Sequence, residues 1–325
     1  MTTKYVSSLV VTAAGISSIS WALATDNVGL GLVLAGSSFP LAVLLAVRAR
    51  LSGRFPVPAL FGGAIVGIIV AVVSYGLVFA FAYAFLLGFA TEGTELLDAL
   101  RVDSRLTTVL ASPWILVLVA EVVIVAPITE EFGKALGARW SKPASSQEAL
   151  LTGVAAGAGF AVVENVLYAL GGAWAGGPWT EILLARLPGA AVHPLATGLV
   201  VLGWWEWRNR SERSRSIRLI LGGVGVHALW NGSLVALTIA EIAFEVGSSL
   251  EAYAAVSLAY VAAMGAVAAA ALWWLSSSVS GPSERDRTLS GFADGRSLGA
   301  WAVLSASLLI PLVMLLLAFP DFYLG

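Results

Sequence analysis

The chain has 325 residues, of which 58% are apolar and only 12% are charged, and its formal net charge is −2 at pH 7. A soluble globular chain has about 25% charged residues, so this composition excludes an ordinary soluble domain and predicts a protein embedded in a membrane. The sequence contains no cysteine, which excludes thiol catalysis, disulfides and cysteine-based zinc sites.

Hydrophobic segments recur along the whole sequence. A helix needs about 20 apolar residues to cross a hydrocarbon core of about 30 Å, and several segments reach that length. We therefore predict an all-α, polytopic helical bundle with about nine transmembrane helices. The predicted spans are 6–24, 28–47, 60–89, 112–138, 149–172, 182–206, 217–243, 252–275 and 299–319.

The basic residues are distributed unevenly between the two sides of these spans. If the amino terminus lies inside, the inner loops hold fourteen of the 18 Lys and Arg residues, and the outer loops hold only Arg101, Arg105 and Arg186. Inner loops of membrane proteins are enriched in Lys and Arg. The sequence thus predicts a multi-pass protein of the cell membrane with its amino terminus inside and its carboxyl terminus outside.

Polar and charged residues concentrate in four consecutive spans. A charged side chain at the bilayer centre costs about 2.5–3.5 kcal/mol, so such residues normally face a partner or a cavity. The polar residues are Glu121, Glu130, Glu131 and Lys134 in 112–138, Glu164, Asn165 and Tyr168 in 149–172, His193 in 182–206, and His227 and Asn231 in 217–243. Counting 1.5 Å per residue from the inner helix ends predicts that Glu130, Glu164, His193, His227 and Asn231 share one layer near the membrane midplane. Glu121 lies about two to three turns farther out.

Spacing within the helices predicts local geometry. Pro127 removes a backbone hydrogen bond and should distort the span 112–138, and Gly153 and Gly157, spaced as G-x-x-x-G, predict close helix packing, as does the run at 222–225. Side chains four residues apart share a helix face. Three such pairs occur: Glu130 with Lys134, Glu164 with Tyr168, and His227 with Asn231.

The chain divides by these features into three predicted parts. Residues 1–111 hold three transmembrane helices and an outer amphipathic loop at 91–111, and residues 112–245 hold the four polar helices. Residues 246–325 hold the last two helices, joined by a linker at 276–298 that is rich in Ser, Gly, Arg and Asp.

Two ways of activating water fit the polar residues. A carboxylate can take a proton from water while a His and Asn pair donates hydrogen bonds to the developing oxyanion. Alternatively, His193, His227 and one of Glu130 or Glu164 form a His₂Glu set that suits a divalent metal such as zinc. The sequence has no H-E-x-x-H and no G-x-S-x-G motif, so neither a helical zincin nor a serine hydrolase is supported.

Two other functions stay open at this point. Intramembrane Glu and His residues also form proton relays in ion-coupled transporters, and a non-catalytic membrane scaffold could carry the same fold.

At these residues the sequence resembles the PrsW family of intramembrane proteases, which is related to the CAAX prenyl endopeptidases and to the APH-1 subunit of γ-secretase. The resemblance covers roughly 118–235. The family is recognised by E-E-x-x-K, F-x-x-x-E-N-x-x-Y, a histidine on a third helix and H-x-x-x-N on a fourth. Here the four elements are Glu130 to Lys134, Phe160 to Tyr168, His193, and His227 to Asn231.

The resemblance implies an endopeptidase that acts on a membrane-anchored protein substrate. The expected partners are this substrate and the lipid bilayer, and no nucleic acid is expected. It implies either a metal cofactor or water activated by glutamate alone. The residues expected to be catalytic are Glu130, Glu131, Glu164, His193, His227 and Asn231, with Lys134, Asn165 and Tyr168 in support.

Overall fold

The structure is a computed structural model that describes residues 3–24, 28–51, 56–89, 113–175, 179–210, 213–243 and 250–279. The predicted outer loop at 91–111, the predicted last span at 299–319, and the linker from residue 280 onward lie outside the described residues.

All regular structure in the described ranges is helical, as the sequence predicts. Six segments of it are long and apolar enough to cross a membrane, which is typical of a polytopic helical bundle. The elements are α1 (Thr3–Ala24), α2 (Val28–Arg50), α3 (Val57–Phe89), α6 (Pro113–Ala120), η1 (Glu121–Val125), α7 (Ala126–Ala138), η2 (Arg139–Ser141), α8 (Ser146–Ala175), α9 (Trp179–Arg186), η3 (Leu187–Ala191), α10 (Val192–Asn209), α11 (Arg213–Ala243) and α12 (Leu250–Val279).

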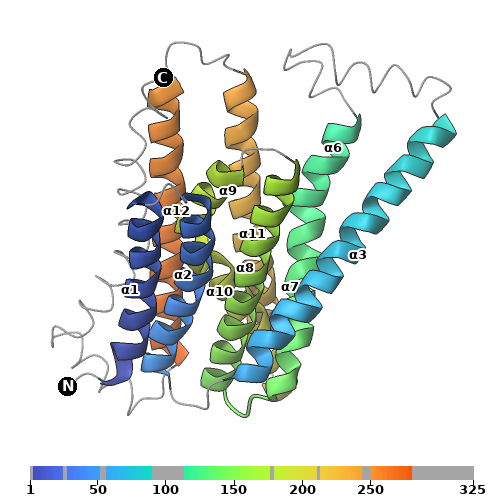
Figure 1. Ribbon diagram of the computed structural model, residues 1–325. Helices are drawn as coiled ribbons and strands as arrows, with labels where there is room; N and C mark the ends of the chain where they lie inside the picture. The colour runs from blue at the N-terminus through green and yellow to red at the C-terminus, as the bar shows by residue number, and fades with distance from the viewer. Residues whose placement is uncertain are drawn as a thin grey trace.

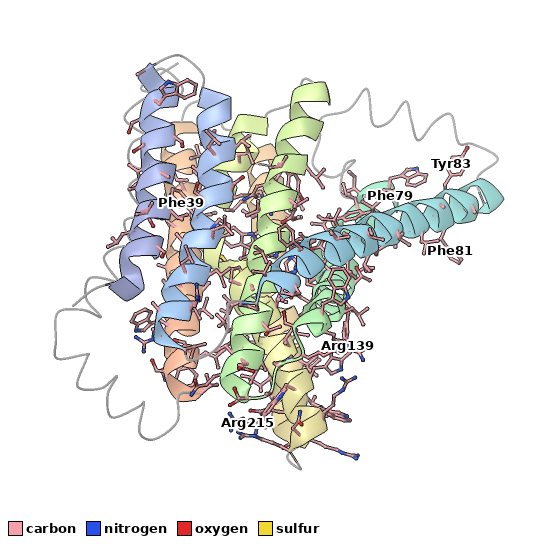
Figure 2. All side chains as sticks on the ribbon, turned by 60° about the horizontal axis from the view of Figure 1, so that its bottom comes forward. Phe39, Phe79, Phe81, Tyr83, Arg139 and Arg215 are labelled. Carbon is pink, nitrogen blue, oxygen red and sulfur yellow. The ribbon has the colours of Figure 1, made fainter. Side chains whose placement is uncertain are left out.

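Helix α8 lies at the centre of the bundle (Figure 1), where α2, α3, α7 and α10 all pack against it. Helix α1 packs on α2, and α11 packs on α10. Helix α3 is inclined away from the others, and Figure 2 shows Phe79, Phe81 and Tyr83 on its diverging end. Arg139 and Arg215 lie toward the opposite end of the molecule. Four of the elements around the centre, α7, α8, α10 and α11, carry the polar residues singled out in the sequence.

Glycines let these helices approach each other closely. A Cβ atom on Gly153 would lie 2.6 Å from the Thr197 carbonyl oxygen, and one on Gly157 would lie 2.3 Å from that of His193. The predicted G-x-x-x-G contact of α8 is thus confirmed, with α10 as its partner. Of the glycines at 222–225, Gly223 meets the Ala196 backbone, whereas a Cβ at Gly222 would have nothing within 4 Å.

The predicted distortion near Pro127 takes the form of a π-helical turn. The Ala126 N–H bonds to the carbonyl of Glu121, five residues back rather than four. Pro127 has no N–H, so the next bond of this kind, to the carbonyl of Val122, cannot form. Asn231 of α11 donates its Nδ2 to that carbonyl at 3.0 Å. A side chain from a neighbouring helix therefore satisfies the backbone group that the proline leaves free.

We expect Asn231→Ala to lower the free energy of unfolding by about 1 kcal/mol, because the bilayer offers the Val122 carbonyl no replacement donor. Thermal unfolding in detergent would measure this. The matched control is Asn209→Ala, which removes a bond from an exposed Nδ2 to the Trp205 carbonyl. Equal stability of the two variants would contradict the capping role of Asn231.

The predicted span 182–206 is not one continuous helix. The short helix α9 ends at Arg186, the 3₁₀ turn η3 contains Pro188, and α10 begins at Val192. A proline within a helix removes a backbone donor and interrupts it. His193 consequently lies in the first turn of α10, beside the break.

Candidate active site

Four helices bring the polar residues together inside the bundle. Helix α7 supplies Glu130, Glu131 and Lys134, all of which are buried. Helix α8 supplies Glu164 and Asn165, α10 supplies His193, and α11 supplies His227. The structure brings these seven residues together in one cluster of contacts.

The Lys134 ammonium is completely buried between two carboxylates. Its Nζ lies 2.6 Å from Glu131 Oε1 and 3.7 Å from Glu130 Oε2. The pair predicted from spacing, Glu130 with Lys134, is therefore the looser of the two. A buried charge needs such partners because desolvation is costly, and here Lys134 compensates the carboxylates of α7.

Both carboxylate oxygens of Glu131 have hydrogen-bond partners. Oε1 accepts a hydrogen bond from Lys134 Nζ and lies 2.9 Å from His227 Nδ1. Oε2 accepts a hydrogen bond from Thr197 Oγ1 at 2.7 Å. A carboxylate only accepts hydrogen bonds, so this contact assigns the proton of His227 to Nδ1 and leaves Nε2 with a free lone pair. Glu131 thus fixes the orientation of His227.

Glu130, His193 and His227 converge on one point. Each offers a ligand atom, and these atoms lie within 4.8 Å of one another. The two imidazole rings meet edge to face, with centroids 4.6 Å apart. Glu130 Oε2 has no hydrogen-bond partner among the described residues. Buried polar atoms normally have one, so this oxygen is free to engage a bound group.

Glu164 lies next to this group. Its Oε2 is 3.0 Å from His193 Nε2, although these atoms are not aligned for a hydrogen bond. The same oxygen is bonded by Arg186 Nη2, and Arg186 Nε donates to Asn165 Oδ1 at 2.8 Å. Asn165 in turn donates to the Gly36 carbonyl of α2. Asn165 and Arg186 together hold the Glu164 carboxylate in place.

The placement of Arg186 in an outer loop is wrong. Its guanidinium is largely buried at the end of α9, paired with Glu164, and it lies 4.5 Å from the centroid of the Tyr168 ring. The physical reason is that a carboxylate inside the bundle is stabilised by a cation, and the break at η3 ends α9 where Arg186 can supply it. Tyr168 therefore contacts Arg186, and Arg186 contacts the site residue Glu164.

We expect Arg186→Gln to lower the free energy of unfolding by about 3 kcal/mol, because it leaves Glu164 without its cation. Denaturant unfolding in detergent would measure this, with the exposed Arg218→Gln as the control. Adding Glu164→Gln should recover most of the loss, since both partners are then neutral. If the double variant were as unstable as the single one, the ion pair would not be the cause.

The predicted site residue Asn231 and the polar residue Glu121 lie apart from the convergence point. Asn231 bonds to the Val122 backbone, as described above. Glu121 is buried in η1 and accepts a hydrogen bond from Ser74 of α3 at 3.2 Å. Of the two polar residues that share a face of α11, His227 therefore belongs to the site, whereas Asn231 bonds to the backbone of η1.

Sequence reasoning missed Thr197 and Arg186. Thr197 stands four residues after His193, so helical spacing alone could have placed both on one face. Threonine is common in membrane helices as a backbone-bonding residue, which hides such a role. For Arg186 no sequence signal distinguishes it from an ordinary residue at the end of a span.

The residues present fit a metal ion by ligand type and proximity. Two histidines and one glutamate are a set that zinc accepts in catalytic sites, with water as a further ligand. The bond between Glu131 and His227 Nδ1 is the outer contact that metal-ligating histidines usually make. Lys134 Nζ, 3.1 Å from His193 Nδ1, adds a positive charge beside the ligands, which opposes binding of a cation.

One comparison with known proteins gave a match. The model of the PrsW family, described as intramembrane metalloproteases, matches residues 55–267. No curated protein and no solved structure matches the chain. The matched region runs from the start of α3 into α12 and contains every residue of the convergent site.

Proposed function

Since the chain belongs to the PrsW family of intramembrane metalloproteases, we propose that it is an endopeptidase that hydrolyses a peptide bond of a membrane-anchored protein. Membership supports protease activity at the level of the family. The observation that carries the proposal for this chain is the convergence of Glu130, His193 and His227 within 4.8 Å, with one Glu130 oxygen unpartnered inside the bundle.

We assign the transfer of the proton from water to Glu130. Its unpartnered Oε2 lies 3.7 Å from His227 Nε2, so a water molecule at the convergence point would contact both. General base catalysis of this kind contributes about 10²–10⁴ in rate. Glu131 has both oxygens engaged and holds His227. Lys134 balances the negative charge of the two carboxylates on α7.

A second carboxylate, Glu164, completes the proposed site. It faces His193 from the opposite side to Lys134, so the imidazole lies between an acid and an ammonium group. We propose that this arrangement fixes the His193 ring, and that the ring can then donate a hydrogen bond to the carbonyl oxygen of the scissile bond as negative charge develops on it.

The mechanism divides on whether a metal is bound. A zinc ion held by Glu130, His193 and His227 would polarise the substrate carbonyl and ionise a bound water. Metal-free protein, prepared with a chelator and checked by elemental analysis, separates the two cases. Loss of cleavage that returns on adding zinc supports the metal site, whereas full activity without metal supports glutamate-activated water.

The test of the proposal is cleavage of single-span substrates. Purified protein in lipid nanodiscs would be incubated with a panel of such proteins, and the products would be identified by mass spectrometry. Cleavage at a bond within or next to the span is the expected result. If no substrate of the panel is cleaved while the protein carries ions across proteoliposome membranes, the result would contradict the protease hypothesis and support the transporter hypothesis.

We further propose that the protein lies in the cell membrane with about nine spans, the amino terminus inside and the carboxyl terminus outside. The uneven distribution of Lys and Arg supports this orientation. Because the chain has no cysteine, single cysteines introduced at positions 4 and 321 would report the two sides by thiol labelling. Labelling of both from the same side would contradict it.

A further inference from the structure

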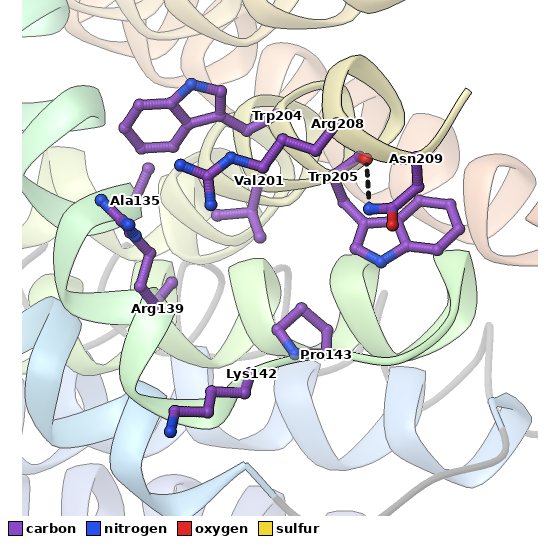
Figure 3. Close-up of a pocket in the computed structure, with 10 residues that line it drawn as sticks. Ala135, Arg139, Lys142, Pro143, Val201, Trp204, Trp205, Arg208 and Asn209 are labelled. Carbon is purple, nitrogen blue, oxygen red and sulfur yellow. Dashed lines mark hydrogen bonds between the residues drawn. The ribbon is translucent and has the colours of Figure 1, made fainter. Parts of the chain in front are cut away.

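A cavity of about 340 Å³ lies where the end of α7 faces the end of α10. Arg139 and Lys142 line it from the segment after α7, and Arg208 lines it from α10 (Figure 3). Trp204 and Trp205 form its aromatic wall. We call this the basic cavity.

The three cations of the basic cavity have no carboxylate partner among the described residues. Two acidic side chains near this end of the bundle are engaged elsewhere: Glu148 accepts from the Ala144 N–H, and Glu206 is buried with Arg215 at 3.1 Å. Like charges gathered around a cavity repel one another. An anion in the cavity would relieve that repulsion.

The residue types indicate which anion fits. Arginine offers a planar set of donors that matches phosphate oxygens, and lysine binds phosphate as a point charge. Tryptophan is enriched where membrane helices meet the headgroup layer. Trp204 also packs edge to face on Phe132 of α7, with ring centroids 5.8 Å apart, so the aromatic wall already joins the two helices that form the cavity.

We propose that the basic cavity binds a phosphate group, carried by an anionic lipid headgroup or by a soluble phosphate ester, which bridges Arg139 and Lys142 to Arg208. The two helices that it joins are those that carry Lys134 and His193. Ala135, the residue after Lys134, and Ala138, one turn beyond Lys134, line the same cavity. Binding there would hold the ends of α7 and α10 at a fixed spacing. This proposal does not depend on protease activity.

The experiment measures phosphate binding by the full chain. In one arm, the protein is extracted from nanodiscs of phosphatidylcholine alone, or of equal parts phosphatidylcholine and phosphatidylglycerol, and retained lipid is counted by native mass spectrometry. In the other arm, glycerol 3-phosphate is titrated into detergent-solubilised protein by calorimetry. Retention of phosphatidylglycerol over phosphatidylcholine identifies the lipid as the source, and saturable binding in the second arm identifies a soluble ester.

The test variant is Arg139→Gln with Arg208→Gln, and the matched control is Arg213→Gln with Arg218→Gln, which removes the same charge from exposed positions of α11. A direct charged hydrogen bond to a bound phosphate contributes at least about fivefold in affinity, so the test variant, which loses two such bonds, should bind about 25-fold more weakly than the control, which loses none. Lys142→Gln alone, expected to weaken binding about fivefold, serves if the double variant fails to fold.

Equal binding by the test and control variants would overturn the proposal. So would equal retention of phosphatidylcholine and phosphatidylglycerol together with no heat of binding for glycerol 3-phosphate.

Discussion

Glu130→Gln is expected to lower the rate of substrate cleavage about a thousandfold while the protein still folds. Glutamine has the size of glutamate but cannot accept a proton from water and is a poor metal ligand, so the loss is expected under either mechanism. Removing the carboxylate also removes a looser contact to Lys134, at 3.7 Å, but leaves the 2.6 Å pair with Glu131 intact. Cleavage kinetics in nanodiscs, with thermal unfolding in parallel, would measure both effects.

The matched control for this variant is Glu148→Gln. Glu148 lies at the start of α8, where its carboxylate accepts a hydrogen bond from the Ala144 N–H, an interaction that a glutamine amide can also make. We expect its cleavage rate to stay near that of the original protein. A cleavage rate in Glu130→Gln that matches this control would reject Glu130 as the group that activates water.

Gly157→Ala is expected to destabilise the bundle by at least about 3 kcal/mol. The added Cβ would lie 2.3 Å from the carbonyl oxygen of His193 and 2.8 Å from the nitrogen of Pro194. These are backbone atoms, so α8 and α10 must separate to make room, and overpacking of this kind commonly costs 1–3 kcal/mol even where side chains can move. Because His193 is one of the two residues displaced, cleavage should fall together with stability.

The control is Gly222→Ala on α11, where a Cβ would have nothing within 4 Å. Alanine is favoured over glycine in a helix by about 1 kcal/mol, so this variant should be as stable as the original or slightly more so. Both substitutions are chemically identical, and unfolding in detergent should move them in opposite directions. If both variants were stabilised, the close contact of α8 with α10 would not exist in the folded protein.

Hydrophobicity predicted most of the described helices well, because a helix that crosses a membrane needs about 20 apolar residues and such runs can be seen in the sequence. The span 182–206 is the exception. Its apolar run continues through Leu187–Ala191, so hydropathy could not reveal the break at η3. Pro188 was the available signal, but prolines also occur in continuous membrane helices when neighbours satisfy the freed groups.

The sequence predicted which residues belong to the convergent site, but it predicted less well which of them contact one another. Buried Glu and His residues are costly in a membrane, so the sequence identifies them. Which acid binds which base depends on helix rotation, and the structure pairs Lys134 more tightly with Glu131 than with Glu130. The pairing of Arg186 with Glu164 could not be predicted, because a charged residue at the end of a span can be exposed to solvent as readily as buried.

The π-helical turn at Glu121–Val125 fits one more residue into the span than a regular α-helix of the same length would hold. One residue of a regular α-helix corresponds to a rotation of about 100°, and the wider π turn absorbs its extra residue without passing that rotation on to α6. Deleting a single residue from this turn should therefore restore a regular helix and leave the faces of α6 and α7 nearly unchanged. Deleting one residue elsewhere in the span would instead rotate α6 against α7 by about 100°. The turn is thus a place where this span tolerates a change of one residue in length while Glu130 keeps its direction.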